Sequence, residues 1–172
     1  AELVPRLMDT KPDRAKVYIL ELEHLTRTAM AEMRTLLMEL RPDALVRTEL
    51  GVLLWQLCDT LKGNVPVKVN LNATELLILP EKSQIVFYRI AQESLNNIAK
   101  HAHATEVNVE LSKTDNRVEL CISDNGRGFS HDEIPPDHYG LKFMQERASS
   151  VGAELTIKST KGTQIILSQI IV

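Results

Sequence analysis

Two short polar stretches carry the side chains that could do chemistry. The first contains Glu93, Asn97 and Lys100, spaced so that a helix would present a carboxylate, an amide and a cation on one face. An amide oxygen can ligate Mg²⁺, a lysine can meet a phosphate, and a carboxylate can orient water or act as a base. The set suits a hydrated Mg²⁺–triphosphate, although an ordinary solvated helix face has the same spacing.

The second stretch, Asp124 to Phe129, reads Asp-Asn-Gly-Arg-Gly-Phe. The alternation before it predicts a strand, so that Asp124 stands at a strand end. A carboxylate there can accept a hydrogen bond from the exocyclic amine of adenine. Gly126 and Gly128 would let the backbone approach a ligand and take positive φ. Taken alone, the motif is equally consistent with a plain Asn-Gly turn.

Three later segments could complete such a site. Residues 130–139 are polar and aperiodic, as in a mobile lid between a strand and a helix. Gly140-Leu141 begins a predicted helix, whose free N–H groups favour a phosphate. Gly162-Thr163 opens the last predicted strand and can add a hydroxyl.

The surrounding elements predict a mixed α/β domain. Apolar periodicity indicates helices over residues 49–61, from 80 onward through the first polar stretch, and over 140–151. Strands are predicted over residues 65–71, 106–112, 117–123, 153–159 and 163–172. Helices with an antiparallel-rich sheet in this order predict a two-layer α/β sandwich.

The chain before this domain is predicted to be helical. Thr10, Pro12 and Asp13 are typical of a helix start. An apolar stripe close to the helical period then follows, formed by Tyr18, Leu22, Leu25, Ala29, Met33, Leu36 and Leu40. We expect a helical hairpin fragment that completes a four-helix bundle by dimerisation; the alternative is an amphipathic helix packed on its own domain. Pro42 ends this helix, which divides the chain into residues 1–42 and 43–172.

Composition narrows the function classes. A chain of 172 residues with 44% hydrophobic residues can bury one sizeable core. The net charge of −3 gives no reason to expect nucleic acid or an anionic membrane as partner. Cys58 and Cys121 are far apart in apolar segments and predict buried free thiols in a reducing compartment. We find no signal peptide or membrane-spanning run, and the start without Met suggests a fragment.

In this order, the motifs resemble the ATP-binding catalytic domain (GHKL or HATPase type) of bacterial sensor histidine kinases. They are most similar to the subfamily that pairs with NarL/LuxR-type response regulators. Residues 93–101 resemble the N box, 124–129 the first glycine box, and Gly140-Leu141 the second. Gly162-Thr163 resembles the closing Gly-Thr, and residues 31–42 the second dimerisation helix and its exit.

The resemblance implies ATP and Mg²⁺ as cofactors and a role for each motif residue. Asn97 would coordinate the metal, with Glu93 as the catalytic residue beside it, and Lys100 and His101 would contact phosphates. Asp124 would read the adenine amine. The other nucleotide-binding residues would be Gly126, Gly128, Phe129, Gly140, Leu141 and, through water, Thr163.

The implied activity is that of an ATP-dependent protein-histidine kinase. The γ-phosphoryl group would pass to a histidine on the dimerisation helix and then to an aspartate of a NarL/LuxR-type response regulator, with catalysis mainly by positioning and charge neutralisation. The implied partners are a second copy, through the N-terminal helices, and that regulator. The expected location is the cytoplasm, whether or not the parent protein is membrane-anchored.

Two features depart from the family pattern. The expected phosphoacceptor, a histidine followed by an acidic residue, is not found before Thr10; His131-Asp132 falls in the predicted lid, and His24 is interpreted as a surface or seam residue. We therefore expect the phosphoacceptor upstream of Ala1 and no autophosphorylation by this chain alone. Phe143 stands where the subfamily often has a second glycine, which bears on lid geometry and nucleotide affinity.

Three alternatives stay open. One is another ATPase or kinase of the superfamily, such as a topoisomerase, mismatch-repair, chaperone or anti-sigma enzyme, although these lack the Leu-Arg-Pro helix exit. Another is a non-catalytic nucleotide-binding regulatory module, which Phe143 permits. The third is a structural dimerisation fragment, which would not need Asp124, Asn97 and Lys100 together.

Overall fold

The computed structural model describes residues 13–20, 22, 26, 42–73, 77–129 and 140–171. The chain divides into two compact units, Ala1–Leu40 and Arg41–Val172. In the first unit, residues 13–20, 22 and 26 are helical, as predicted. The rest of the predicted hairpin and apolar stripe, His24, the helix start at Thr10, and the predicted lid with His131-Asp132 lie outside the described residues.

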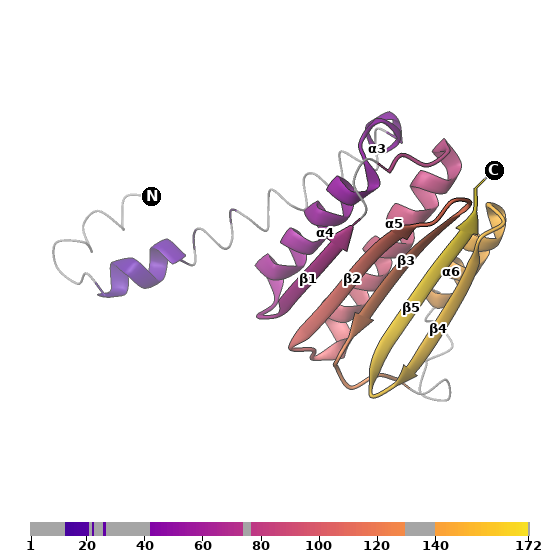
Figure 1. Ribbon diagram of the computed structural model, residues 1–172. Helices are drawn as coiled ribbons and strands as arrows, with labels where there is room; N and C mark the ends of the chain where they lie inside the picture. The colour runs from indigo at the N-terminus through magenta and orange to yellow at the C-terminus, as the bar shows by residue number, and fades with distance from the viewer. Residues whose placement is uncertain are drawn as a thin grey trace. The chain divides into compact units, whose positions relative to one another are not determined.

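A five-stranded sheet forms the framework of the second unit (Figure 1). Its strands lie in the order β1-β2-β3-β5-β4. They are β1 (Lys68–Ala73), β2 (Glu106–Lys113), β3 (Arg117–Asp124), β4 (Glu154–Thr160) and β5 (Gly162–Ile170). β1 pairs with β2 in parallel, and the other three pairs are antiparallel. The antiparallel-rich sheet and both hairpins are thus as predicted.

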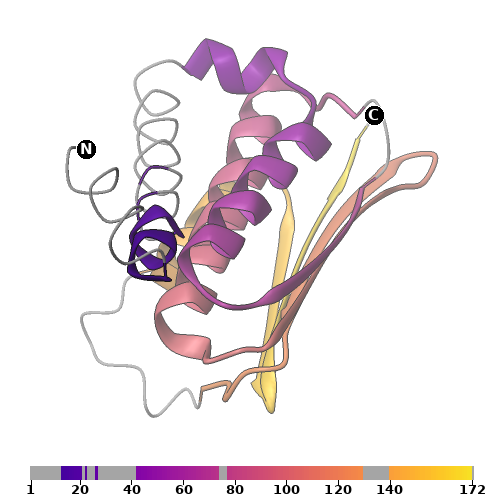
Figure 2. The ribbon, with the colours of Figure 1, turned by 90° about the vertical axis from the view of Figure 1, so that its left-hand side faces the viewer.

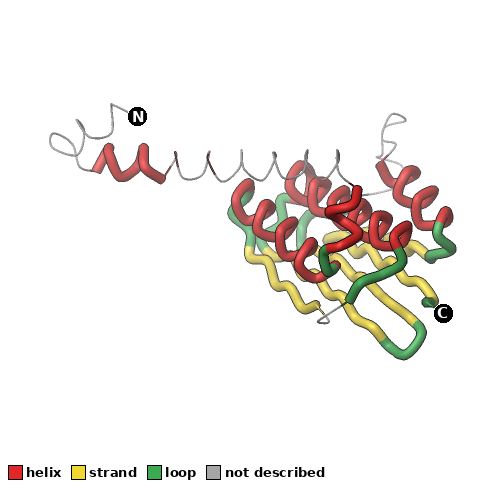
Figure 3. Tube along the Cα trace, turned by 90° about the horizontal axis from the view of Figure 1, so that it is seen from above, coloured by secondary structure: helices red, strands yellow, loops and turns green. Residues whose placement is uncertain are grey.

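Three helices cover one face of the sheet (Figures 2 and 3). They are α4 (Leu50–Asn64), α5 (Glu81–Asn97) and α6 (Gly140–Ser150). Alternate strand residues point toward them, as the regular burial of every second residue along β3 shows. The fully buried core includes Leu53, Phe87, Ile90, Leu120, Met144 and Leu167. The architecture is therefore the predicted two-layer α/β sandwich.

A short helix that the sequence did not predict leads into α4. It is α3 (Pro42–Arg47), and it begins at the residue that was expected to end a helix. Proline suits a first helical position because that position needs no N–H donor. The fully buried Gln84 of α5 fixes this junction: its Nε2 donates to Leu45 O (3.2 Å) and Thr48 O (2.6 Å).

The strand predicted from residue 65 begins three residues later, at Lys68. α4 runs to Asn64, past Gly63, and the N–H of Val65 donates to Leu61 O (3.0 Å) as part of the helix exit. Pro66 has no N–H to offer to a ladder. The alternation of apolar and polar residues from residue 65 therefore begins in the connection between α4 and β1, before the strand itself.

Both cysteines are free, as expected, but the prediction that both are buried is correct only for Cys58. Cys58 is buried in α4, and this burial raises the pKa of its thiol to about 11. Cys121 is only partly buried, because it lies on the face of β3 away from the helices. Among the described helices, none is long and apolar enough to cross a membrane.

Candidate functional site

The first polar stretch lies where α5 changes its helical form. α5 ends at Asn97 and continues as a π-helix, η1 (Ile98–Ala102), after which His103 has a left-handed backbone (φ 51°, ψ 35°). π-turns are rare and frequent at functional sites. Glu93 and Asn97 keep their α-helical spacing. Lys100 lies in the wider π-turn, so its spacing from Asn97 differs from that in an uninterrupted α-helix.

Exposure differs among these residues. Glu93 and Asn97 are half-buried, whereas Lys100 and His101 are exposed. Within the described part of the chain, no hydrogen bond or ion pair is recorded for the side chain of Asn97 or Lys100. An amide and a cation are thus available at the end of α5 to groups that come from outside the chain.

Glu93 lies against the beginning of α6. A Cβ atom placed on Gly140 would come within 2.7 Å of Glu93 Oε1, so this position accepts only glycine without a shift. A carboxylate near a helix N-terminus is electrostatically favourable, because the first N–H groups carry positive partial charge. The structure therefore brings two of the predicted motifs together. Leu141 follows half-buried, and Phe143 is 48% exposed on α6.

Asp124 is the last residue of β3 and is 9% exposed. Its Oδ1 accepts a hydrogen bond from the N–H of Gly126 (2.7 Å). Its Oδ2 is buried and has no partner among the described residues. An unsatisfied buried acceptor costs roughly 1–3 kcal/mol, so the position favours a ligand that brings a donor. The exocyclic amine of adenine is such a donor, and the site fits it.

The loop after Asp124 presses against the end of η1. The N–H of Arg127 donates to the carbonyl oxygen of Ala102 (2.9 Å), and a Cβ on Gly126 would collide with that same oxygen. The residue that directly follows the first polar stretch is therefore in contact with the second stretch. In the described residues, no hydrogen bond joins Asn97 to Asp124; their segments are linked by the backbone hydrogen bond from Arg127 to Ala102.

The turn between β4 and β5 packs against the loop that follows Asp124, on the side away from η1. Gly162 has φ 85°, and a Cβ on it would overlap the carbonyl oxygen of Asp124. Gly128 lies against Thr160 in the same region. The N–H of Phe129 donates to Ser159 Oγ (2.7 Å), which lies 3.4 Å from Thr163 Oγ1. The predicted Gly-Thr motif thus meets the predicted first glycine box.

Two residues that hold the site together were missed in the sequence. Ser159 joins Phe129 to the β4–β5 turn, and Asn125 joins the loop to β2 through its side chain. A serine shortly before Gly-Thr at a hairpin end was a weak signal for the first. An Asn-Gly pair is so common in turns that it gave no signal for the second.

Comparisons with known proteins agree with this arrangement. Residues 82–170 match the family described as histidine kinase-, DNA gyrase B-, and HSP90-like ATPase. Sensor histidine kinase LiaS of Bacillus subtilis is 36% identical over 155 residues, which are 89% of this chain and 43% of LiaS. Sensor protein VraS of Staphylococcus aureus is 38% identical over 146 residues, 84% of this chain and 42% of VraS. The chain thus spans less than half the length of these relatives.

Solved structures show the same fold. The blue-light activated histidine kinase of Erythrobacter litoralis EL346 has a TM-score of 0.65 at 18% identity, covering 94% of this chain and 60% of that chain. The mycobacterial sensor histidine kinase MprB has a TM-score of 0.58 at 17% identity, covering 72% of this chain and 95% of that chain. Because the family match extends over more than half of its residues, this chain belongs to the histidine kinase-, DNA gyrase B- and HSP90-like ATPase family.

Proposed function

We propose that this chain is the ATP-binding kinase core of a two-component sensor histidine kinase. It would donate the γ-phosphoryl group of ATP to a histidine that lies upstream of these residues, for relay to an aspartate of a response regulator. The observation that carries the proposal is Asp124, a buried carboxylate at a strand end whose Oδ2 lacks a donor. The similarity to LiaS and VraS supports the kinase among the family's activities.

In this proposal the adenine end of the site is the loop at Asp124. Its Oδ1 is occupied by the N–H of Gly126, which leaves Oδ2 to accept from the base. The contacts of Gly126 and Gly162 keep the loop between η1 and the β4–β5 turn. Thr163 lies beside this loop and would act through water.

The other end would bind the phosphates and the metal. When bound, Mg²⁺-ATP supplies the transferable phosphoryl group. Asn97 would offer its amide oxygen to the metal, and Glu93 would orient a proton or water beside it. Lys100 and His101 would meet phosphate oxygens. These residues act by position and charge, which is where most catalysis of phosphoryl transfer lies.

The proposed partners are a second copy of the protein and a response regulator. The parent protein would be a homodimer through its N-terminal helices, would act in the cytoplasm and would pair with a regulator of the NarL/LuxR type. The resemblance of residues 31–42 to that subfamily's dimerisation helix supports this finer assignment.

The test has two steps. Thermal unfolding of the 172-residue chain should shift with Mg²⁺-ATP, because a ligand at 100 times its Kd stabilises a fold by about 2.7 kcal/mol. A longer polypeptide with the upstream helix should then incorporate labelled γ-phosphate, whereas this chain should not. Absence of the shift would disprove nucleotide binding. A shift without labelling of the longer polypeptide would instead assign a regulatory nucleotide-binding module.

A further inference from the structure

We propose that Asn125 is a positioning residue that sets the nucleobase preference of the site, by clamping the loop that carries Asp124 to the beginning of β2. The inference rests on the proposed function, because it concerns the residue that would read adenine. Asn125 itself is exposed and lies outside every role that the motifs assigned.

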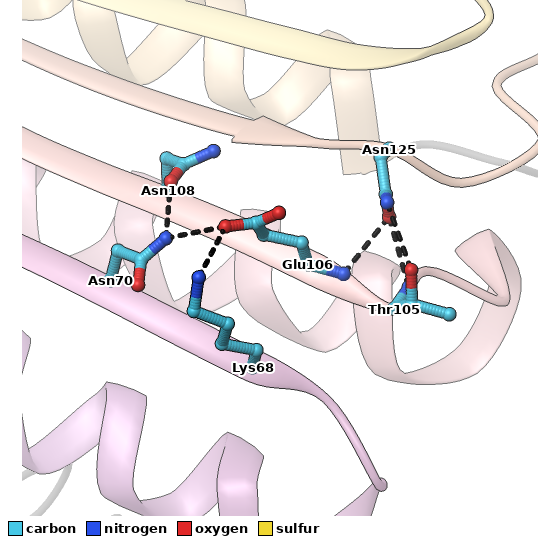
Figure 4. Close-up of polar contacts among 6 residues, drawn as sticks. All are labelled: Lys68, Asn70, Thr105, Glu106, Asn108 and Asn125. Atoms are coloured by element: carbon cyan, nitrogen blue, oxygen red, sulfur yellow. Dashed lines mark hydrogen bonds and ion pairs between the residues drawn. The ribbon is translucent and has the colours of Figure 1, made fainter.

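The side chain of Asn125 makes three hydrogen bonds to the two residues where β2 begins (Figure 4). Its Oδ1 accepts from the N–H of Thr105 and of Glu106, both at 2.9 Å. Its Nδ2 is 2.9 Å from Thr105 Oγ1. The N–H of Asn125 also donates to Glu106 O (3.2 Å). The amide oxygen, the amide nitrogen and the backbone N–H of Asn125 therefore all form hydrogen bonds to Thr105 or Glu106.

The target of the clamp is itself fixed from the opposite side by the edge strand β1. Glu106 Oε1 accepts from Lys68 Nζ (3.0 Å) and from Asn70 Nδ2 (2.7 Å). The N–H of Lys68 donates to Thr105 O (3.0 Å). The hydrogen bonds from Lys68 and Asn70 favour the ionised form of Glu106 and lower its pKa below the ordinary value of 4.5. Asn125 thus binds to a fixed support.

The position of this clamp matters because it is adjacent to Asp124. β3 leaves its pairing with β2 at Asp124, which is opposite Val107. The next two residues decide where its carboxylate lies: Asn125 holds the chain toward β2, and Gly126 donates to Oδ1 (2.7 Å). Without these three side-chain hydrogen bonds, the connection from the loop to the beginning of β2 would be reduced to the backbone hydrogen bond from Asn125 N–H to Glu106 O, and the direction of Oδ2 would be less fixed.

The chemistry of the base gives this position a measurable consequence. Adenine presents an amine donor where guanine presents a carbonyl acceptor, so a fixed carboxylate accepts the first and repels the second. Discrimination of this kind is large only when the buried polar group cannot move to accommodate the wrong partner. The triphosphate is common to both nucleotides, so displacement of Asp124 should change the ratio of their affinities.

The experiment measures Kd for Mg²⁺-ATP and Mg²⁺-GTP by calorimetry with the 172-residue chain. We expect Asn125→Ala to reduce the preference for ATP about tenfold, the factor that corresponds to one hydrogen bond of ordinary strength. A role in stability alone would lower the unfolding temperature and leave the ratio unchanged.

Two variants keep the test independent of folding failure. Asn125→Asp retains the acceptor for both N–H groups, and Thr105 can donate its hydroxyl to the second oxygen, so this variant should retain most of the preference. Thr105→Val removes only one of the three side-chain hydrogen bonds and should reduce the preference by a smaller factor.

The matched control is Asn108→Ala. Asn108 belongs to the same polar network, where its Oδ1 accepts from Asn70 (2.8 Å), but it makes no recorded hydrogen bond to the described loop. Its loss should leave the ratio unchanged. An unchanged ratio in Asn125→Ala, or in Thr105→Val if the alanine variant does not fold, would overturn the inference, as would an equal loss in the control. Failure of the unaltered chain to bind ATP would instead overturn the proposed function.

Discussion

The two ends of the candidate site are built in opposite ways. At the adenine end, Asp124 is the last residue of β3, and the loop that follows it hydrogen-bonds to the beginning of β2, to Ala102 of η1 and to Ser159 of β4. At the phosphate end, the side chains of Asn97 and Lys100 have no recorded hydrogen bond within the described residues. The protein thus holds in place Asp124, which would select the nucleobase, whereas Asn97 and Lys100, which would bind the metal and the phosphates, are not held by hydrogen bonds within the described residues. A preorganised acceptor gives selectivity, whereas phosphates and a metal can orient their own ligands.

The substitution Asp124→Asn is the strongest test of this difference between the two ends of the site. The amide has the same shape, and its oxygen would still be needed by the N–H of Gly126. Its NH₂ would then stand where Oδ2 stands, so that a donor would face the adenine amine. We expect ATP and adenosine to bind at least about 100-fold more weakly, with the unfolding temperature unchanged. Calorimetry with both ligands checks this, and retained tight binding would refute the assigned role.

Asn97→Asp tests the opposite end. A carboxylate there would lie one helical turn from Glu93 and close to the phosphates, so repulsion would oppose the triphosphate. We expect Mg²⁺-ATP binding to be lost while adenosine binds as in the unaltered chain. Equal weakening of both ligands would show that the two ends are not separable.

Gly162→Ala tests how tightly the adenine end is closed. The new Cβ would meet the carbonyl oxygen of Asp124 at a φ that already disfavours side chains, so we expect a loss of about 3 kcal/mol in the free energy of unfolding. Gly152 is the matched control, because it has φ 66° but nothing within 4 Å of a Cβ. Its alanine variant should lose only about 1 kcal/mol in urea unfolding. Equal losses would mean that the close approach at Gly162 has no energetic consequence.

His103→Asn should stabilise the phosphate end slightly. His103 has a left-handed backbone at φ 51°, a conformation that asparagine adopts more readily than most residues. Histidine is itself enriched in this conformation, so we expect only a small gain in the free energy of unfolding in urea, with ATP affinity unchanged. A loss of affinity would show that this side chain takes part in binding.

The smallest expected effect is on the pH dependence of stability, through Glu106, one of the two residues that Asn125 binds. The folded pKa of Glu106 lies below its ordinary value of 4.5, because Lys68 and Asn70 hydrogen-bond to the carboxylate. Its contribution to stability should therefore be complete above about pH 4.5 and should disappear as the pH falls through the lower folded pKa. The difference in the free energy of urea unfolding between Glu106→Gln and the unaltered chain should be present at pH 7 and should shrink as the pH falls below 4.5. A constant difference would contradict the linkage.

Local patterns were enough to predict most of the fold. The β2–β3 hairpin was recoverable because its turn is closed nearby, with the N–H of Thr114 donating to Arg117 O (2.9 Å). The start of β1 could not be predicted correctly, because the alternation of apolar and polar residues already begins in the connection that follows α4. The π-turn at Lys100 also escaped prediction, because a single residue spacing is compatible with either helical form.

The site was predictable only as separate motifs. The residue types at Asp124 and Asn97 indicated their chemistry. The residues that hold these motifs in place act over long sequence distances: Asn125 binds Thr105 and Glu106, and Ser159 binds Phe129 from 30 residues away. The contact of Ser159 with Phe129 follows from the sheet order, which places β5 between β3 and β4 and which no local pattern encodes.

The most direct test of the account is a crystal structure of this chain with Mg²⁺ and a non-hydrolysable ATP analogue. The account predicts the adenine amine at about 2.9 Å from Asp124 Oδ2 and the metal at about 2.1 Å from the amide oxygen of Asn97, on the same nucleotide. A nucleotide bound away from Asp124, or a metal held without Asn97, would contradict it.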